Sequence, residues 1–268
     1  MGTEDTRATA ASPVADAPTA MPTATPTATE TATATATTTS TETVKTAKTT
    51  KTVIVDYGVG NLFSLQSSFA FIGQPVTVSG DPAVIAQADR LILPGVGAFA
   101  DAAAKLRENR LDALICQRVG AGVPLLGICQ GMQMLFDESL EYGRHRGLSL
   151  IHGVVRPMDE VVPGELKIPH IGWNALHFVG EKHPIFKYCT EGDCVYFVHS
   201  YHGTDCADSV IATTEYGATL TAAVARGNVC GCQFHPEKSG RVGLSILRAF
   251  CEWCPDARPE DEKGGASV

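Results

Sequence analysis

The sequence lacks any apolar run near the roughly 20 residues that a membrane-spanning helix needs, and it lacks clusters of basic residues. Lys and Arg number 21 against 29 Asp and Glu, which gives a formal net charge of −8. A surface that follows nucleic-acid phosphates is therefore not expected. Residues 1–5 contain no basic segment followed by an apolar core, so we expect no secretory signal. These absences predict a protein of the reducing cytoplasm, without membrane or nucleic-acid partners.

The nine cysteines also lack the further ligands that a metal site would need. Two short-spaced pairs occur, Cys230 with Cys232 and Cys251 with Cys254, but no second pair or spaced histidine pair completes a tetrahedral set. An odd number of cysteines scattered through apolar segments does not indicate a disulfide framework either. We therefore expect free, buried thiols, no metal and no cofactor.

Large apolar side chains are scarce in residues 1–51, where Thr and Ala dominate from Thr19 to Thr50. Such a segment buries too little surface to offset the entropy of ordering it, so it is predicted to be disordered. A plastid transit peptide is the alternative, which the Thr and Ala content favours and the scarcity of Arg opposes. Residues 255–268 are expected to form a polar tail, which leaves residues 52–254 for one domain.

Apolar strand-like runs and helical periodicities alternate in the first half of this domain. Strands are predicted at residues 52–57, 76–78, 90–94 and 123–128, and helices at 61–73, 82–87 and 101–118. Further strands are predicted at residues 153–155, 175–178, 194–199, 210–213, 222–225 and 229–234, before a last helix at 243–253. The pattern predicts an α/β fold, in which a mostly parallel central sheet is flanked by helices and the C-terminal half is β-rich.

A sharp strand-to-helix turn is predicted around Cys129, in the run Gly-Ile-Cys-Gln-Gly of residues 127–131. The run ends an apolar strand and is followed by a helical segment at residues 132–136, which is the nucleophile-elbow pattern with Cys in place of Ser. A helix N-terminus favours a thiolate, and the backbone N–H of Gln130 is in place to stabilise an oxyanion. A buried structural cysteine beside a tight turn is the alternative.

A base and a carboxylate for this thiol occur in the run Gln-Phe-His-Pro-Glu-Lys of residues 233–238. His235 follows an apolar strand directly, and sites in α/β sheets assemble at the C-terminal ends of strands. A cysteine nucleophile needs a base to take its proton and a carboxylate to orient that base. Cys129, His235 and Glu237 supply one residue for each role, although a surface His–Glu pair is the alternative.

These two motifs together resemble the class I glutamine amidotransferases, and above all the glutaminase subunits of imidazole glycerol phosphate synthase. Four further segments carry the closer resemblance: Asp-Tyr-Gly-Val-Gly-Asn at 56–61, Pro-Gly-Val-Gly at 94–97, Pro-His-Ile-Gly-Trp-Asn at 169–174 and Tyr-Phe-Val-His-Ser-Tyr at 196–201. The motifs occur in the family's order and span about three quarters of the chain. The resemblance implies a flavodoxin-like class I amidotransferase fold and hydrolysis of glutamine through a cysteine thioester.

The resemblance also implies roles for individual residues. It makes Cys129 the nucleophile, His235 the general base and acid, and Glu237 the orienting carboxylate. The remaining implied positions are the oxyanion donors Val96, Gly97 and Gln130, the glutamine-binding positions Gly97, Gln133, Ser200 and Tyr201, and the partner or ammonia-passage positions Trp173, Asn174, Tyr196 and Lys238.

The implied partner is a cyclase subunit with a (β/α)₈ barrel, which receives the ammonia and makes imidazole glycerol phosphate in histidine biosynthesis. A barrel of about 250 residues does not fit in this chain, so the cyclase must be a separate chain. Two features depart from the family: Gln130 stands where Leu is usual, and residues 1–51 have no counterpart. A glutaminase subunit of another synthase, a free glutaminase or γ-glutamyl hydrolase, and a silent interaction module are the alternatives.

Overall fold

A computed structural model describes residues 50–255. The extension predicted for residues 1–51 and the tail predicted for 255–268 lie outside the described residues, apart from residues 50, 51 and 255. All nine cysteines lie within the described part, and all are free thiols. No helix among the described residues is long and apolar enough to cross a lipid bilayer.

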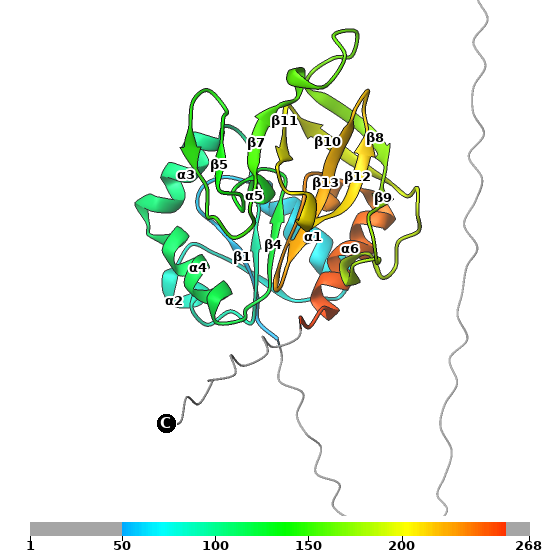
Figure 1. The fold of residues 1–268 in the computed structure, drawn as a ribbon. Coiled ribbons are helices and arrows are strands. Elements are labelled where there is room, and N and C mark those ends of the chain that lie inside the picture. Colours follow the sequence, from blue (N-terminus) through cyan, green and yellow to red (C-terminus); the bar gives the residue numbers. More distant parts are fainter. Residues whose placement is uncertain (1–49, 256–268) are drawn as a thin grey trace, which may run out of the picture. The chain divides into compact units, whose positions relative to one another are not determined.

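Five parallel strands form the centre of the fold, as the sequence predicts (Figure 1). Their order is β2 (Val76–Ser79), β1 (Thr52–Val55), β3 (Arg90–Leu93), β4 (Leu125–Ile128) and β14 (Val229–Cys232). Every residue of β1, β3, β4 and β14 is buried, because helices or further strands cover both faces. Three antiparallel strands extend the sheet beyond β14: β13 (Thr219–Arg226), β12 (Val210–Glu215) and β9 (His177–Phe178).

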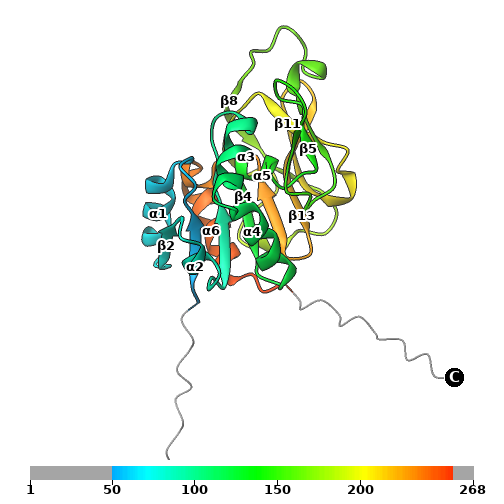
Figure 2. The same cartoon turned by 90° about the vertical axis from the view of Figure 1, so that its left-hand side faces the viewer.

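Helices pack on both faces of the parallel strands, and Figure 2 shows the sheet between them. Helices α1 (Leu62–Phe71) and α6 (Gly240–Glu252) cover one face, where Leu65, Phe69 and Phe250 pack with Ile54 of β1. Helices α2 (Pro82–Ile85), α3 (Phe99–Glu108) and α4 (Leu111–Gly120) cover the other face. Their apolar side chains pack with Val53, the neighbour of Ile54 along β1, because successive strand residues point to opposite faces.

The single helix predicted for residues 101–118 is wrong, because the structure has two helices there. The chain leaves α3 at Asn109, and Arg110 adopts a left-handed conformation with φ of 56° before α4 begins at Leu111. The break brings both Leu106 and Leu111 into the core, where each is fully buried. The apolar spacing alone did not reveal it, since no glycine or proline marks the turn.

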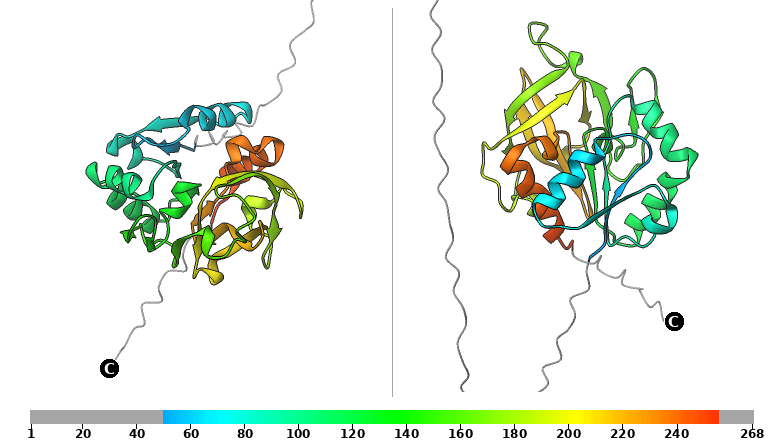
Figure 3. Two further views of the ribbon diagram at one scale, coloured as in Figure 1. Left: turned by 90° about the horizontal axis from the view of Figure 1, so that it is seen from above. Right: turned by 180° about the vertical axis from the view of Figure 1, so that it is seen from behind.

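Two smaller sheets lie beside the C-terminal ends of the parallel strands, and Figure 3 shows them from above. One pairs β8 (His170–Ala175) with β10 (Cys194–His199), and the other contains β11 (Tyr201–Thr204), β7 (Val154–Pro157), β5 (Glu138–Ser139) and β6 (His145–Arg146). Short 3₁₀ helices occupy Met158–Glu160, Pro184–Phe186, Ala207–Ser209 and Pro236–Lys238. The β-rich C-terminal half is thus confirmed, although β5, β6, β11 and most of β8 were not predicted from the sequence.

Candidate active site

The turn predicted at Cys129 lies between β4 and a one-turn helix, α5 (Gln130–Gln133), which is shorter and earlier than the helical run predicted at 132–136. Cys129 has φ of 53° and ψ of −112°, a strained backbone that projects the thiol above the sheet. Its N–H donates to the carbonyl of Cys232 on β14 at 2.8 Å. Gly131 touches the backbone of β3 so closely that a Cβ atom there would overlap the carbonyl oxygen of Leu93. The turn therefore requires glycine at this position.

His235 and Glu237 reach the thiol from the neighbouring strand. Strands β4 and β14 are parallel, with Ile128 opposite Cys232, so the residues that follow both strands meet at one edge of the sheet. The ring Nδ1 of His235 lies 2.8 Å from Oε1 of Glu237, and the two side chains are only 3% and 2% exposed. Since a carboxylate accepts, Nδ1–H donates to Glu237, and Nε2 remains for Cys129.

The electrostatic setting of His235 favours its protonated form. Burial lowers the pKa of His235, but hydrogen bonds from the ring to Cys129 and Glu237, and their negative charges, outweigh burial and raise the pKa to about 9. At pH 7 the ring therefore holds a proton beside the sulfur, which favours the thiolate as nucleophile. This arrangement has the acid–base chemistry needed for acyl transfer through a thioester.

Backbone and side-chain hydrogen bonds fix the loop that carries His235 to strand β10. The N–H of His235 donates to the carbonyl of Tyr196 at 3.0 Å. The hydroxyl of the buried Ser239 donates to the carbonyl of His235 at 2.7 Å and accepts from the N–H of Tyr196 at 3.0 Å. The position of the base is thus set by β10 as well as by β14.

The Pro-Gly-Val-Gly loop of residues 94–97 lies against the N-terminus of α5. The buried Tyr57 hydroxyl donates to the carbonyl of Pro94 at 2.7 Å, and burial followed by the charge of Cys129 raises the pKa of Tyr57, so the hydroxyl stays protonated. Gly97 has φ of 86°, a conformation that favours glycine. Within the described residues, no hydrogen bond engages the N–H of Val96, Gly97 or Gln130. These three N–H groups are therefore free to donate to a ligand.

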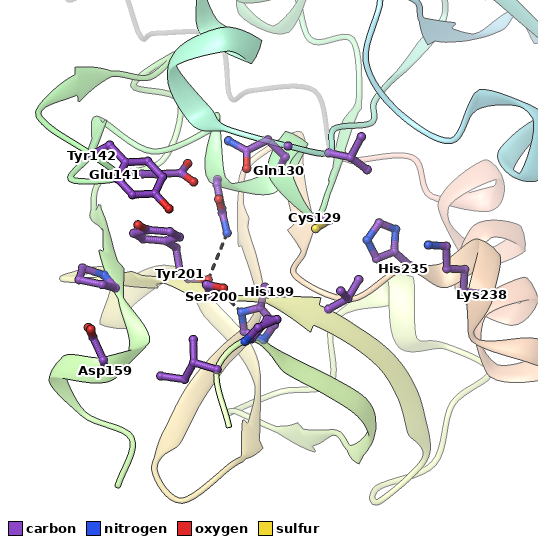
Figure 4. Close-up of a pocket in the computed structure, with 17 residues that line it drawn as sticks. Cys129, Gln130, Glu141, Tyr142, Asp159, His199, Ser200, Tyr201, His235 and Lys238 are labelled. Carbon is purple, nitrogen blue, oxygen red and sulfur yellow. Dashed lines mark hydrogen bonds between the residues drawn. The ribbon is translucent and has the colours of Figure 1, made fainter. Parts of the chain in front are cut away.

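A pocket of about 580 Å³ opens beside these groups (Figure 4). Cys129 and His235 lie at one end of it, and Tyr142 and Tyr201 lie at the other. All predicted oxyanion and glutamine-binding residues line this pocket: Val96, Gly97, Gln130, Gln133, Ser200 and Tyr201. The sequence-predicted positions thus converge on one cavity with the thiol at its edge.

Comparisons with known proteins agree with this geometry. The family described as glutamine amidotransferase class-I matches residues 53–253. The imidazole glycerol phosphate synthase subunit HisH of Salinibacter ruber is 45% identical over 221 residues, which cover 81% of this chain and 99% of the relative. The HisH subunit of Syntrophotalea carbinolica is 51% identical over 202 residues, which cover 74% and 98% of the two chains. The chain belongs to the HisH family of class I glutamine amidotransferases.

Solved structures support the fold of this HisH-family chain at lower identity. A glutamine amidotransferase structure superposes with a TM-score of 0.59 and 18% identity, covering 75% of this chain and 97% of the other. A PurLQS structure from Thermotoga maritima has a TM-score of 0.58 and 18% identity, covering 76% and 98%. These likenesses confirm the predicted amidotransferase fold.

The amide of Gln133 has only its oxygen free for a ligand in this HisH-family pocket. Its Nε2 donates to the carbonyl of Tyr201 at 3.1 Å and to Oε1 of Gln233 at 3.0 Å. Both N–H groups are therefore used, and Oε1 remains as an acceptor. An acceptor at this place suits the α-ammonium group of an amino acid.

The four residues predicted at the partner surface divide between two faces of the β8–β10 sheet. Trp173 is 55% exposed, packs edge-on against Tyr196 with ring centroids 6.0 Å apart, and lies on the outer face with the half-exposed Ile171. The ammonium group of Lys238 lies 5.8 Å from the centre of the Tyr196 ring. Asn174 points to the inner face instead, because strand neighbours alternate.

The inner-face contacts of Asn174 form part of a buried polar network. Its Oδ1 lies 2.8 Å from Nε2 of His170, and its amide donates to the carbonyl of Glu215. His170 in turn lies 3.1 Å from His199, whose Nδ1–H donates to the carbonyl of Tyr201 at 2.9 Å. Asn174 is thereby connected to the pocket rather than to the outer surface.

The pocket is also lined by polar residues that were not predicted as site residues, among them Glu141, Tyr142 and Asp159. Glu141 is 8% exposed, and its Oε2 accepts from the N–H of Phe99 at the start of α3, at 2.7 Å. Burial raises the pKa of Glu141, which the hydrogen bond from Phe99 only partly opposes. No spacing in the sequence singles out these residues, since Glu141 and Tyr142 lie in the turn between β5 and β6 and Asp159 lies in the 3₁₀ helix Met158–Glu160.

Proposed function

We propose that Cys129, His235 and Glu237 hydrolyse glutamine to glutamate and ammonia, for use by the cyclase subunit of imidazole glycerol phosphate synthase. The observation that carries this proposal is the buried Cys–His–Glu arrangement beside a pocket with free backbone N–H groups. Membership of the HisH family supports histidine biosynthesis as the setting. We further propose that residues 52–254 form the amidotransferase domain.

The proposed reaction begins with attack of the Cys129 thiolate on the carboxamide carbon of glutamine, after the thiol proton has passed to His235. The carbonyl oxygen becomes an oxyanion, which the free N–H groups of Gln130 and Gly97 stabilise. His235 then gives its proton to the leaving nitrogen, the C–N bond breaks, and ammonia and a γ-glutamyl thioester result. Water attacks the thioester and gives a proton to His235, which returns it to the sulfur as glutamate leaves.

The same pocket offers groups for the amino-acid end of glutamine. We assign the α-ammonium group to the free Oε1 of Gln133 and to the carboxylate of Glu141, whose charge is opposite. The α-carboxylate is assigned to the backbone at Ser200 and Tyr201. Glu141→Gln is expected to raise KM for glutamine about tenfold with a smaller change in kcat, since a charge-assisted hydrogen bond contributes about 1.5–3 kcal/mol.

The cyclase is proposed to dock on the outer face of the β8–β10 sheet. Trp173, Tyr196 and Ile171 give this face the aromatic and apolar character that interface centres share, and Lys238 adds a positive charge at its edge. Lys238 also lines the pocket, so the docked partner would lie where ammonia leaves. The partner itself is proposed to be a (β/α)₈ barrel.

The experiment that tests this function measures glutamate released from glutamine by the purified chain. It is run alone and then with a histidine-pathway cyclase subunit and its nucleotide substrate. We expect weak release alone, an increase by orders of magnitude with the liganded cyclase, and none with Cys129→Ala. Strong release that is indifferent to the cyclase would retain the Cys129 chemistry but contradict the histidine-pathway role, in favour of a free glutaminase or another synthase.

A further inference from the structure

Gln233 is a fully buried amide at the C-terminal end of β14, two residues before His235, and the proposed reaction has not used it. Its side chain lies between two groups of the site. Oε1 accepts from Nε2 of Gln133 at 3.0 Å, and Nε2 lies 3.7 Å from the sulfur of Cys129. The amide thus links a glutamine-binding side chain to the nucleophile.

The orientation of this amide follows from a chain of donors and acceptors. The chain starts at the backbone carbonyl of Tyr201, which can only accept; Figure 4 shows the contacts to it as dashed lines. The atom of Gln133 that faces this carbonyl must therefore be Nε2, and its second N–H points to Gln233. Gln233 must present its oxygen to Gln133, which turns its NH₂ group towards Cys129.

A second hydrogen bond holds the Tyr201 carbonyl in place. Nδ1–H of the buried His199 also donates to the carbonyl of Tyr201, at 2.9 Å. The carbonyl therefore has two N–H partners and holds its place at the junction of β10 and β11. Reversal of the Gln233 amide would put its NH₂ group against the NH₂ group of Gln133 in the buried interior, where an unpaired polar group costs more free energy than in water.

We propose that Gln233 is a further catalytic residue of the glutaminase reaction, because its N–H donates to the Cys129 sulfur and stabilises the thiolate. This inference rests on the proposed function. When the thiol proton passes to His235, the sulfur gains a negative charge and accepts the Gln233 N–H more strongly. When the sulfur bonds to the carboxamide carbon, the charge moves to the carbonyl oxygen of the tetrahedral intermediate, and this hydrogen bond weakens. Gln233 thus acts on the free nucleophile, whereas the oxyanion donors act on the intermediate.

The other end of the same amide gives Gln233 an effect on substrate binding. By holding one N–H of Gln133, it leaves Oε1 of Gln133 as the group that faces the substrate. Two variants separate these effects. Gln233→Met removes both the donor and the acceptor with little change in length. Gln233→Glu retains an oxygen for Gln133 but, once ionised, replaces the donor by a negative charge beside the sulfur.

Asn228 offers a matched control at the opposite end of β14. Its amide donates to the carbonyls of Val119 at 2.9 Å and Val123 at 2.8 Å, at the edge of the sheet away from the pocket. Asn228→Asp removes these donors just as Gln233→Glu removes the donor to sulfur. If loss of an amide donor at β14 lowers the stability of the fold, Asn228→Asp shows the same loss of stability without a change beside Cys129.

The experiment measures the rate of iodoacetamide alkylation of Cys129 against pH in the full chain, with the modified residue identified by mass spectrometry. We expect the pH midpoint to rise by about one unit in Gln233→Met and in Gln233→Glu, and to stay unchanged in Asn228→Asp. With the cyclase present, kcat should fall about tenfold or more in both Gln233 variants, while KM for glutamine rises mainly in Gln233→Met. Folding of each variant is checked by circular dichroism.

An unchanged alkylation midpoint in a folded Gln233 variant would overturn the inference, as would an equal shift in Asn228→Asp. If Gln233→Met does not fold, Gln233→Glu alone decides by the same criterion. Alkylation needs neither glutamine nor the cyclase, so its result is separate from the proposed function. That function fails only if the wild-type chain shows no glutamine hydrolysis that depends on the cyclase.

Discussion

The buried pair of His235 and Glu237 predicts a specific dependence of stability on pH. Its neighbours raise the pKa of His235 from 6.5 to about 9, and one pKa unit corresponds to 1.36 kcal/mol, so protonation of the folded site is worth about 3 kcal/mol. A raised pKa stabilises the fold fully below pH 6.5 and loses this contribution as pH rises through about 9. Glu237→Gln removes one of the two charges responsible and should remove a large part of the effect.

The assay is urea unfolding of both proteins at pH 6.5 and at pH 9.5. The wild-type free energy of unfolding should fall by about 3 kcal/mol between these values through His235, and that of Glu237→Gln should fall by clearly less. Groups remote from His235 that titrate in this window contribute equally to both proteins and cancel in the comparison. Cys129→Ala serves as a second reference, because it removes the sulfur and leaves the 2.8 Å contact with Glu237. Equal pH dependence in wild type and Glu237→Gln would refute the reasoning.

Three further predictions concern the turn and the loop beside it. Gly131→Ala should lower the free energy of unfolding by about 2 kcal/mol in urea titrations, because its Cβ overlaps the Leu93 carbonyl; unchanged stability would contradict this close packing. Tyr57→Phe should cost about 1–2 kcal/mol in the same assay and lower kcat, because it leaves the Pro94 carbonyl without its donor; a variant equal to wild type in both would count against that role. Gln130→Leu should stabilise the fold by about 1 kcal/mol with glutaminase activity retained, since Nε2 of Gln130 is buried without a partner among the described residues; a loss of stability would show that the amide is satisfied.

The parallel half of the fold could be predicted from the sequence because four of its five strands are buried on both faces. Strands β1, β3 and β4 are apolar apart from Thr52 and Arg90 at the start of β1 and β3, and they end at turns, so their positions follow from hydrophobicity. The break at Arg110 could not be predicted, because it depends on the packing of α3 and α4 rather than on a local turn residue. Strand β8 was mostly missed, since Ile171 and Trp173 are exposed apolar residues that mask its alternation.

The candidate site could be predicted where its chemistry is carried by side chains in recognisable runs. Cys129 and His235 each follow a buried strand, which made their meeting at one sheet edge predictable. Glu141 was missed because a lone glutamate near a two-residue strand has no pattern to distinguish it. The contact between Gln233 and Cys129 was also out of reach, since it joins residues 104 positions apart through an amide whose orientation depends on Tyr201.

The pairing of β4 with β14 has a consequence for how activity arises during folding. The thiol is attached to one of these strands and the base with its carboxylate to the other, and the N–H of Cys129 donates directly to Cys232. Contacts of such large sequence separation carry a high loop-closure entropy and form late. A nascent or partly unfolded chain therefore has the thiol without its base. The chain can hydrolyse glutamine only once β14 has paired with β4 and completed the central sheet.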